Sequence, residues 1–236
     1  KVFRFFPSKP TNSLLLISFI NPSSIPMPTA FLFDLDGVII DSEPQYTSFW
    51  TAVGHRDFPE DPQFAHKIKG STLTQILSRY YPEGSEARER VVEDLNRFEE
   101  QMSYPLISGA LDFIGALRAE GWRTAVVTSS NHQKMENLQR HHPDLYGHFD
   151  RVFTAEDAPR SKPFPDCYEN AARALGFQPQ DCYVVEDSIN GVKAGQASGA
   201  HTIGITTSHP AEILRPYCES IVDNYNDLKE RIFTKA

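Results

Sequence analysis

Short, mainly apolar runs alternate with longer amphipathic segments along most of the chain. The apolar runs predict buried strands at residues 30–33, 123–127, 151–153, 183–185, 201–205 and 221–222. The amphipathic segments have helical spacing at residues 111–120, 132–141, 165–175 and 188–198. Strands that alternate with helices predict parallel βαβ units. We therefore expect an α/β protein with a doubly wound parallel sheet.

A block of helical pattern interrupts this alternation after the first strand. Its apolar residues recur at helical spacing, and no convincing strand run appears before residue 105. The first helix is expected at residues 44–53, with proline in its first turn. The pattern predicts an all-helical domain at residues 46–105, inserted into an α/β domain that comprises residues 29–45 and 106–236.

Composition and charge limit the classes of partner. The net charge of −8 disfavours binding to nucleic acid or to an anionic membrane. Cys167, Cys182 and Cys218 are odd in number and lack the spacing of metal ligands. They are expected to be packing residues in a reducing compartment.

Two aspartates follow the first predicted strand. Asp34 and Asp36 lie two residues apart, so in extended chain their carboxylates point to the same side, and Gly37 adds backbone freedom directly after them. Open α/β sheets bind ligands at the carboxyl ends of their strands. The pair suits a metal together with a nucleophile and an acid–base group. A solvated acidic turn or a calcium loop has a similar pattern, so the D-x-D-G run alone leaves these alternatives open.

Four motifs in a fixed order distinguish these alternatives. They are F-D-L-D-G-V-I-I-D-S-E, V-V-T-S-S-N, S-K-P-F-P-D and V-V-E-D-S-I-N-G-V. Together they resemble the signatures of the haloacid dehalogenase superfamily, in particular its β-phosphoglucomutase-like subgroup of sugar-phosphate phosphatases and mutases. The resemblance covers the chain from Ala30 onward. It implies a Rossmann-like core with a helical cap that closes over the site.

The resemblance also implies roles for individual residues. Asp34 is the expected nucleophile and Asp36 the acid–base group, protonated at first. Lys162 is expected to neutralise the nucleophile and the transferred phosphoryl group, and Thr128 to donate hydrogen bonds to phosphoryl oxygens. The expected metal ligands are Asp34, Asp36 through its backbone carbonyl, Glu186 and Asp187. The expected substrate-binding residues are Lys69, Gly70, Ser129, Ser130 and Asn131.

Electrostatics favour a divalent cation in such a site. One pair of unit charges 4 Å apart is worth about 4 kcal/mol at an effective dielectric constant of 20. A phosphate dianion beside several carboxylates would therefore be excluded unless cations were present. Mg²⁺ is the expected cofactor, because it is a hard ion that binds carboxylates together with substrate phosphate.

The cap sequence favours hydrolysis over phosphoryl transfer within the substrate. The mutase pattern has a histidine after the first motif, where this chain has Tyr46. It also has an arginine shortly after Lys-Gly, where this chain has Leu73. A guanidinium is well shaped to hold a second phosphate, so its loss argues against a bisphosphate intermediate. Tyr46 and Trp50 share one helical face and are expected to be core residues.

These observations predict a Mg²⁺-dependent phosphatase that acts on a small phosphorylated metabolite, in particular a sugar phosphate, through an aspartyl-phosphate. The alternatives are a β-phosphoglucomutase-type mutase, an inorganic pyrophosphatase, and a non-catalytic module that binds a phosphate ligand. The protein is expected to be a cytoplasmic monomer.

The first 28 residues differ from the rest of the chain. They combine a basic start, an apolar run at 14–20 and the sequence N-P-S-S-I-P-M-P. The run is too short to span a bilayer, although the segment has features of a signal peptide. The favoured interpretation is that Met27 is the true start, because the catalytic strand usually lies near the amino terminus in the family that the chain resembles. Residues 1–28 are expected to be an extension outside the fold.

Overall fold

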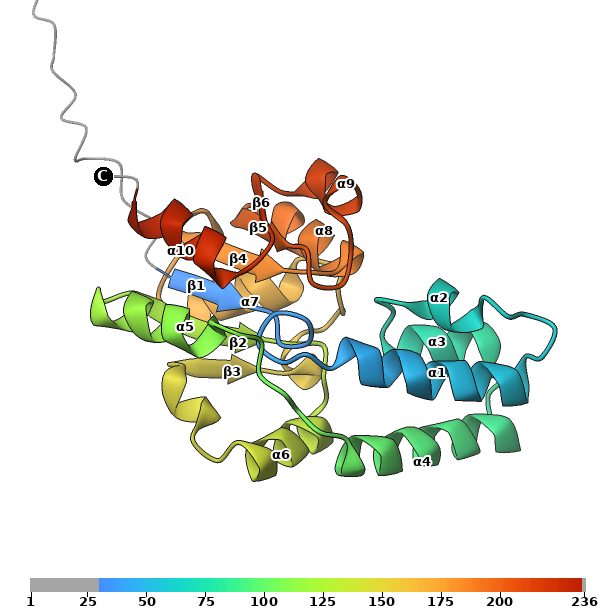
Figure 1. Ribbon diagram of the computed structural model, residues 1–236. Helices are drawn as coiled ribbons and strands as arrows, with labels where there is room; N and C mark the ends of the chain where they lie inside the picture. Colours follow the sequence, from blue (N-terminus) through green and yellow to red (C-terminus); the bar gives the residue numbers. More distant parts are fainter. Residues whose placement is uncertain (1–29, 235–236) are drawn as a thin grey trace, which may run out of the picture.

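The computed structural model describes residues 30–234, and its centre is a six-stranded parallel sheet (Figure 1). The strands are β1 (Ala30–Phe33), β2 (Arg123–Val127), β3 (Arg151–Phe153), β4 (Cys182–Glu186), β5 (His201–Ile205) and β6 (Ser220–Val222). All six predicted strands are present, and their ends differ from the prediction by at most one residue. The prediction for residues 1–28 lies outside the described residues.

Ten α-helices accompany the sheet in the described part of the chain. They are α1 (Glu43–Asp57), α2 (Phe64–Ile68), α3 (Leu73–Tyr80), α4 (Glu86–Gln101), α5 (Ala110–Ala119), α6 (His132–His141), α7 (Asp166–Leu175), α8 (Ile189–Ser198), α9 (Ala211–Leu214) and α10 (Tyr225–Phe233). The predicted helices of the α/β part are confirmed. Helices α9 and α10 were not predicted, although Asn224 caps α10 by accepting hydrogen bonds from two backbone N–H groups.

The strand order β3-β2-β1-β4-β5-β6 places the first strand in the middle of the sheet. The chain runs outward from β1 through β2 to β3, then returns to the other side of β1 and runs outward again from β4 to β6. The order therefore reverses between β1 and β4. In open α/β sheets a ligand binds at the carboxyl ends of the strands at such a switch point.

Helices cover both faces of the sheet, so its strands are buried. Residues of β1 alternate between two cores: Phe31 and Phe33 pack with α5 and α10 on one face, and Ala30 and Leu32 pack with α7 and α8 on the other (Figure 1). Both faces of β1 need apolar residues for this reason, which explains why its sequence is a continuous apolar run.

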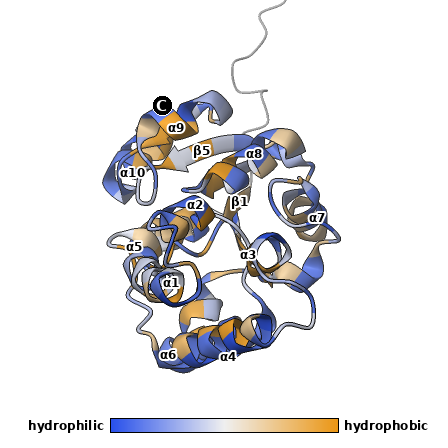
Figure 2. Ribbon diagram, turned by 90° about the vertical axis from the view of Figure 1, so that its right-hand side faces the viewer, coloured by the Kyte–Doolittle hydropathy of each residue, from blue (hydrophilic) through white to orange (hydrophobic). Residues whose placement is uncertain are grey.

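Helices α1 to α4 form a cap between β1 and β2 in the sequence, and they lie beyond the arrowhead ends of the strands in Figure 1. The cap has a core of its own, which includes Trp50, Phe64, Ile76 and Val91. Figure 2 looks onto the cap and shows hydrophilic and hydrophobic stretches on its helices, as expected for helices that bury one face. The inserted helical cap is confirmed, and its limits at residues 46 and 105 stay a prediction.

The described residues include no helix of the length and apolar character that a membrane crossing requires.

The side chain of Asp57 joins three segments of the cap. It accepts hydrogen bonds from Arg56 at the end of α1, from the Tyr81 hydroxyl after α3 and from Arg90 of α4. The hydrogen bonds from Arg56, together with those from Tyr81 and Arg90, hold the pKa of Asp57 below its usual value, against a smaller opposing effect of burial. The charged form of Asp57 therefore stabilises the folded cap.

We expect Asp57→Asn to lower the free energy of unfolding near pH 7 by roughly 1 to 3 kcal/mol, because hydrogen bonds to a charged acceptor are lost. A depressed pKa contributes stability above the unfolded-state value of about 4, and this contribution is lost as the pH falls through the folded-state pKa. The difference between variant and parent in urea unfolding should therefore shrink in acid. Asp61→Asn removes the partner of Lys67, whose side chain is exposed, and should leave the stability nearly unchanged because solvent screens the pair. A difference for Asp57→Asn that is the same at both pH values would contradict this account.

Candidate active site

A cavity of about 540 Å³ lies between the carboxyl ends of the strands and the cap. Its wall contains every residue that the sequence predicted for the site: Asp34, Asp36, Lys69, Gly70, Thr128, Ser129, Ser130, Asn131, Lys162, Glu186 and Asp187. Nine of these residues come from the four motifs, and Lys69 and Gly70 come from the cap. The structure thus brings all of them to one place, as expected from the switch point of the sheet.

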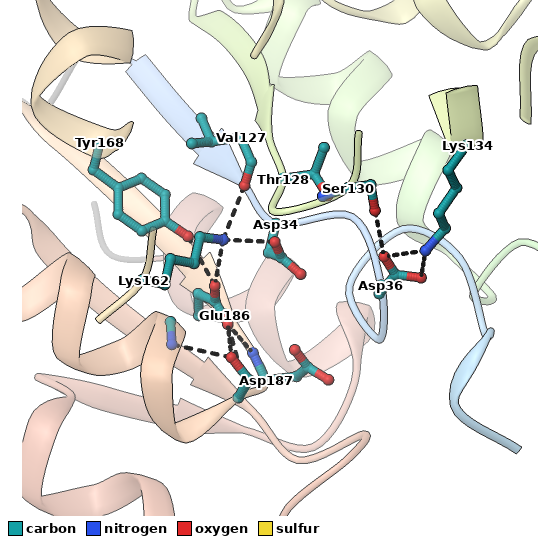
Figure 3. Close-up of polar contacts among 12 residues, drawn as sticks. Asp34, Asp36, Val127, Thr128, Ser130, Lys134, Lys162, Tyr168, Glu186 and Asp187 are labelled. Atoms are coloured by element: carbon teal, nitrogen blue, oxygen red, sulfur yellow. Dashed lines mark hydrogen bonds and ion pairs between the residues drawn. The ribbon is translucent and has the colours of Figure 1, made fainter. Parts of the chain in front are cut away.

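Lys162 lies at the centre of the polar contacts on the core side (Figure 3). Its Nζ lies 2.6 Å from Oδ1 of Asp34, 2.7 Å from Oε1 of Glu186 and 3.0 Å from the carbonyl oxygen of Val127. All three donors of the ammonium are therefore used. Although burial opposes it, the carboxylates of Asp34 and Glu186 raise the pKa of Lys162 above its usual range. Lys162 is thus a fully charged, fully bonded cation beside the expected nucleophile.

Glu186 is held by hydrogen bonds on both of its oxygens. Oε1 accepts from Lys162 and from the Tyr168 hydroxyl, and Oε2 accepts from the backbone N–H groups of Asp187 and Ser188 and from the Ser188 hydroxyl. The side chain has no exposed surface. Glu186 therefore orients Lys162 and the turn between β4 and α8 even without a metal ion.

Negative charge exceeds positive charge where β1 and β4 end. Carboxylate oxygens of Asp34, Glu186 and Asp187 all lie within 4.8 Å of one another. Burial, opposed by Lys162 and reinforced by Glu186, raises the pKa of Asp34 to about 7. Burial and the charges of Glu186 and Asp34 raise the pKa of Asp187 well above its usual range. One ammonium does not compensate three carboxylates, so this oxygen-rich donor set fits a hard divalent cation.

Gly37 allows the loop after β1 to approach Asp187. Its φ is +74°, which is in the left-handed region, and a Cβ at this position would lie 1.8 Å from Oδ2 of Asp187. The glycine of the first motif is therefore required by geometry.

Asp36 is bound by a second lysine that was not predicted. Lys134 Nζ lies 2.7 and 2.6 Å from the two carboxylate oxygens of Asp36. The hydroxyls of Ser42 and Ser130 also donate to this carboxylate. Figure 3 shows Asp34 engaged by Lys162 and Asp36 engaged by Lys134, on different sides of the site.

The contact with Lys134 affects the pKa of Asp36. Burial acts to raise the pKa of Asp36, but the charge of Lys134 and the hydrogen bonds from Lys134, Ser42 and Ser130 outweigh it, so the pKa is lowered. In this arrangement the adjacent ammonium favours the carboxylate form of Asp36. The expectation that Asp36 begins the reaction protonated stays a prediction.

Lys134 could have been found from its spacing. It lies four residues before Leu138 on α6, and both residues face the interior. A lysine on the apolar stripe of a helix next to the second motif indicates a buried charge with a partner. The partner itself, Asp36, lies 98 residues away in the sequence.

The predicted substrate-binding residues of the second motif also have contacts within the protein. The Thr128 hydroxyl accepts a hydrogen bond from the Ser130 backbone N–H, the Ser130 hydroxyl donates to Asp36, and Asn131 caps α6 by accepting from the Lys134 backbone N–H. Ser129 lines the cavity. The roles of all four residues toward a substrate stay a prediction.

Hydrogen bonds join the cap to the core beside the cavity. Asn190 of α8 donates to the carbonyl oxygen of Gly70, and Gln75 of α3 donates to that of Lys162. Lys69 of the cap lies 3.1 Å from a carboxylate oxygen of Glu43. The cavity therefore lies under a cap that is hydrogen-bonded to the core through α8 and through Lys162.

As expected, Trp50 is buried in the cap core and Tyr46 packs against that core, although Trp50 also lines the cavity. Tyr46 is half-buried and lines the cavity, and its hydroxyl lies 2.6 Å from Oε1 of Glu99 on α4. Its polar group thus faces a buried carboxylate rather than solvent.

Comparison with known proteins gives a consistent result. The family model described as haloacid dehalogenase-like hydrolase matches residues 28–199. Hexitol phosphatase A of Escherichia coli is 32% identical over 191 residues, covering 78% of this chain and 85% of that protein. Glycerol-1-phosphate phosphohydrolase 1 of Saccharomyces cerevisiae is 29% identical over 227 residues, covering 85% of this chain and 84% of that protein.

Among solved structures, a β-phosphoglucomutase from Clostridium difficile superposes with a TM-score of 0.72, covering 89% of this chain and 96% of that chain, at 23% sequence identity. At this level of identity the likeness concerns the fold. It supports the doubly wound core with an inserted helical cap.

Gly191 offers a test of the geometry around Glu186. A Cβ at Gly191 would lie 1.8 Å from the Glu186 carboxylate, whereas a Cβ at Gly115, also within a helix, would meet no atom within 4 Å. We expect Gly191→Ala to lower the free energy of unfolding by roughly 1 to 3 kcal/mol through overpacking. Gly115→Ala should raise it by up to about 1 kcal/mol, because alanine favours the helix. Equal effects of the two substitutions in urea unfolding would contradict the tight fit of Glu186.

Proposed function

Since this chain belongs to the haloacid dehalogenase-like hydrolases and is an enzyme of the phosphatase type, we propose that it hydrolyses small phosphorylated metabolites, in particular sugar phosphates, with Mg²⁺ and through an aspartyl-phosphate. One observation carries the proposal. Asp34 follows the central strand at the switch point of the sheet and accepts a hydrogen bond from Lys162. Its carboxylate lies within 4.8 Å of carboxylate oxygens of Glu186 and Asp187. A nucleophile, a buried cation and an acidic cluster thus meet in one cavity.

The residues that would hold Mg²⁺ are Asp34, Asp187 and the backbone carbonyl of Asp36. Glu186 was also predicted as a ligand, and its five hydrogen bonds favour a supporting role beside the ion. When bound, the ion would supply positive charge that offsets the carboxylates and the phosphate dianion.

The proposed reaction has two steps. In the first, an oxygen of Asp34 attacks phosphorus, the bond from phosphorus to the leaving oxygen breaks, and an aspartyl-phosphate forms. In the second, Asp36 accepts a proton from water as the water oxygen attacks phosphorus, and inorganic phosphate and free Asp34 result. Lys162 balances the charge on Asp34 and on the phosphoryl group, and Thr128 would donate to phosphoryl oxygens.

The leaving alkoxide needs a proton in the first step, and Asp36 is the proposed donor. In the described arrangement, the contact with Lys134 favours the carboxylate form of Asp36, which is the form that the second step requires. The proton for the first step therefore has to reach Asp36 when substrate binds.

The lysines of the cavity favour hydrolysis over mutase chemistry. The cavity wall contains three lysines and no arginine in the described part of the chain. Lys162 is paired with Asp34 and Glu186, Lys134 with Asp36, and Lys69 with Glu43. No lysine of the wall is left without a carboxylate partner to hold the second phosphate of a bisphosphate intermediate. Leu73, which replaces the arginine of the mutase pattern, lies in the wall.

The volume and lining of the cavity support a small polar metabolite. A volume of about 540 Å³ suits a ligand of monosaccharide size, and threonines, serines and Asn190 offer hydrogen bonds to hydroxyl groups. The names of the two relatives, a hexitol phosphatase and a glycerol-1-phosphate phosphohydrolase, agree with this class. Pyrophosphate is a weaker candidate, because its second phosphate would also need a free cation.

A non-catalytic binding module is disfavoured because Asp34, Asp36, Lys162 and Asp187 are all present and assembled. We further propose a cytoplasmic monomer. The three cysteines are free, and two of them are buried, which suits a reducing compartment.

We expect hydrolysis of p-nitrophenyl phosphate in the presence of Mg²⁺, its loss on addition of EDTA, and recovery when Mg²⁺ is restored. Asp34→Asn should reduce turnover by at least about 10⁴-fold, because no covalent intermediate can form. Asp41→Asn, which changes an exposed carboxylate of the same loop, serves as the matched control and should retain activity. Metal-dependent turnover by Asp34→Asn would eliminate the aspartyl-phosphate mechanism.

A second experiment separates phosphatase from mutase. With β-glucose 1-phosphate and a trace of glucose 1,6-bisphosphate, we expect release of inorganic phosphate and no accumulation of glucose 6-phosphate. The reason is that, among the described residues, each lysine of the cavity wall is already paired with a carboxylate. Formation of glucose 6-phosphate faster than release of phosphate would favour the mutase. A panel of phosphorylated sugars and polyols, with and without Mg²⁺, then identifies the preferred substrate.

A further inference from the structure

Lys134 is a buried lysine to which the proposed mechanism assigns no role. The residue is 4% exposed, and its ammonium is shared between the two oxygens of Asp36 at 2.7 and 2.6 Å. Burying an ammonium is costly unless it is paired and hydrogen-bonded. Both of these hydrogen bonds go to the proposed acid–base group. The ammonium of Lys134 therefore influences the Asp36 carboxylate more directly than it influences any other group of the site.

The cap contacts Lys134 as well. Nζ of Lys134 lies 4.6 Å from the ring centroid of Tyr46 on α1, and the Tyr46 hydroxyl donates to the buried carboxylate of Glu99 on α4. An ammonium over an aromatic face is stabilised by the ring. Lys134 thus has Asp36 as its partner from the core and Tyr46 as its partner from the cap, and these contacts restrict its movement.

Asp36 in turn is held by three side chains at once. Ser42 donates to Oδ1, Ser130 donates to Oδ2 at 3.1 Å, and Lys134 contacts both oxygens. The side chain of Asp36 keeps 31% of its surface exposed, on the wall of the cavity. A carboxylate that is anchored on one side and open on the other has a defined direction toward a ligand in the cavity.

We propose that Lys134 is a positioning residue that holds the Asp36 carboxylate in the orientation needed to activate water in the second step. This inference rests on the proposed phosphatase function. In that step the oxygen of water forms a bond to phosphorus, the bond between phosphorus and Asp34 breaks, and a proton of the water passes to Asp36. Misplacing a reacting group by about 1 Å can cost about 100-fold in rate, so the loss of the anchor should slow this step.

The two steps can be separated with p-nitrophenyl phosphate. Nitrophenolate leaves without needing a proton, so formation of the aspartyl-phosphate from this substrate depends little on Asp36. The ratio kcat/KM reports the steps up to departure of nitrophenolate, whereas kcat also includes hydrolysis of the intermediate. A defect confined to the second step therefore lowers kcat and KM together.

We expect Lys134→Met to lower kcat for p-nitrophenyl phosphate by about 10- to 100-fold, to lower KM in parallel, and to leave kcat/KM within about threefold of the parent. Rapid mixing should show a burst of nitrophenolate that approaches one equivalent per enzyme. Mass spectrometry of the quenched enzyme should show a phosphorylated Asp34. Lys134→Gln, which keeps a hydrogen-bond donor, should show the same pattern with a smaller loss.

The matched control is Lys193→Met. Lys193 on α8 also lies over a tyrosine ring, at 5.1 Å from the centroid of Tyr217, and is not among the residues of the cavity wall. Its substitution should leave kcat, KM and the amplitude of any burst as in the parent. If thermal melting shows that Lys134→Met is unfolded, Lys134→Gln decides the question.

Equal losses in kcat and kcat/KM without a burst would show that Lys134 has only a structural role, and unchanged kinetics would show that it has none. Either result overturns the inference and leaves the phosphatase function intact. Failure of the proposed function is distinguishable, because the parent protein would then be inactive with Mg²⁺ or Asp34→Asn would remain active, and the inference would fall with it.

Discussion

The site depends on the ammonium of Lys162, which lies 2.6 Å from Asp34 and 2.7 Å from Glu186 in a buried environment. None of these groups would be stable alone, because a buried charge without a partner loses its charge or unfolds the structure around it. Together they neutralise one another in part. The remaining negative charge, to which Asp187 adds, explains why a divalent cation suits the site. The site thus suits a cation because its buried negative charge exceeds its buried positive charge.

The topology of the sheet makes this arrangement possible. Strands β1 and β4 are neighbours where the strand order reverses, so Asp34 and Asp187 meet although the sequence separates them by a cap and half of the core. The cap then closes the cavity through contacts such as that of Asn190 with Gly70. A cap that contacts the loops of the core can exclude water from the cavity and complete the site when substrate binds.

Each of the two aspartates of the first motif is paired with a different lysine. Lys162 forms an ion pair with Asp34, and Lys134 forms an ion pair with Asp36. Their surroundings differ. Burial, together with the neighbouring carboxylates, raises the pKa of Asp34 to about 7. Burial acts in the same direction on Asp36, but the ammonium and hydroxyl donors around it outweigh burial and lower its pKa. Two carboxylates only two residues apart are thereby suited to different tasks, because each pKa is determined by the groups around it.

Hydrophobic spacing along the sequence predicted the strands and the inserted helical block, because such spacing is a local property. The resemblance of its motifs to a known family predicted eleven of the residues that line the cavity. The sequence also indicated the excess of negative charge at the site. Only the tertiary structure decided that Lys134 pairs with Asp36, 98 residues away, that Tyr46 faces Glu99, and that Lys134, Ser42 and Ser130 lower the pKa of Asp36. These features depend on distances between segments that are remote in the chain. No spacing along the sequence specifies such distances, and burial and neighbouring charges set the protonation of each group only after the segments have packed together.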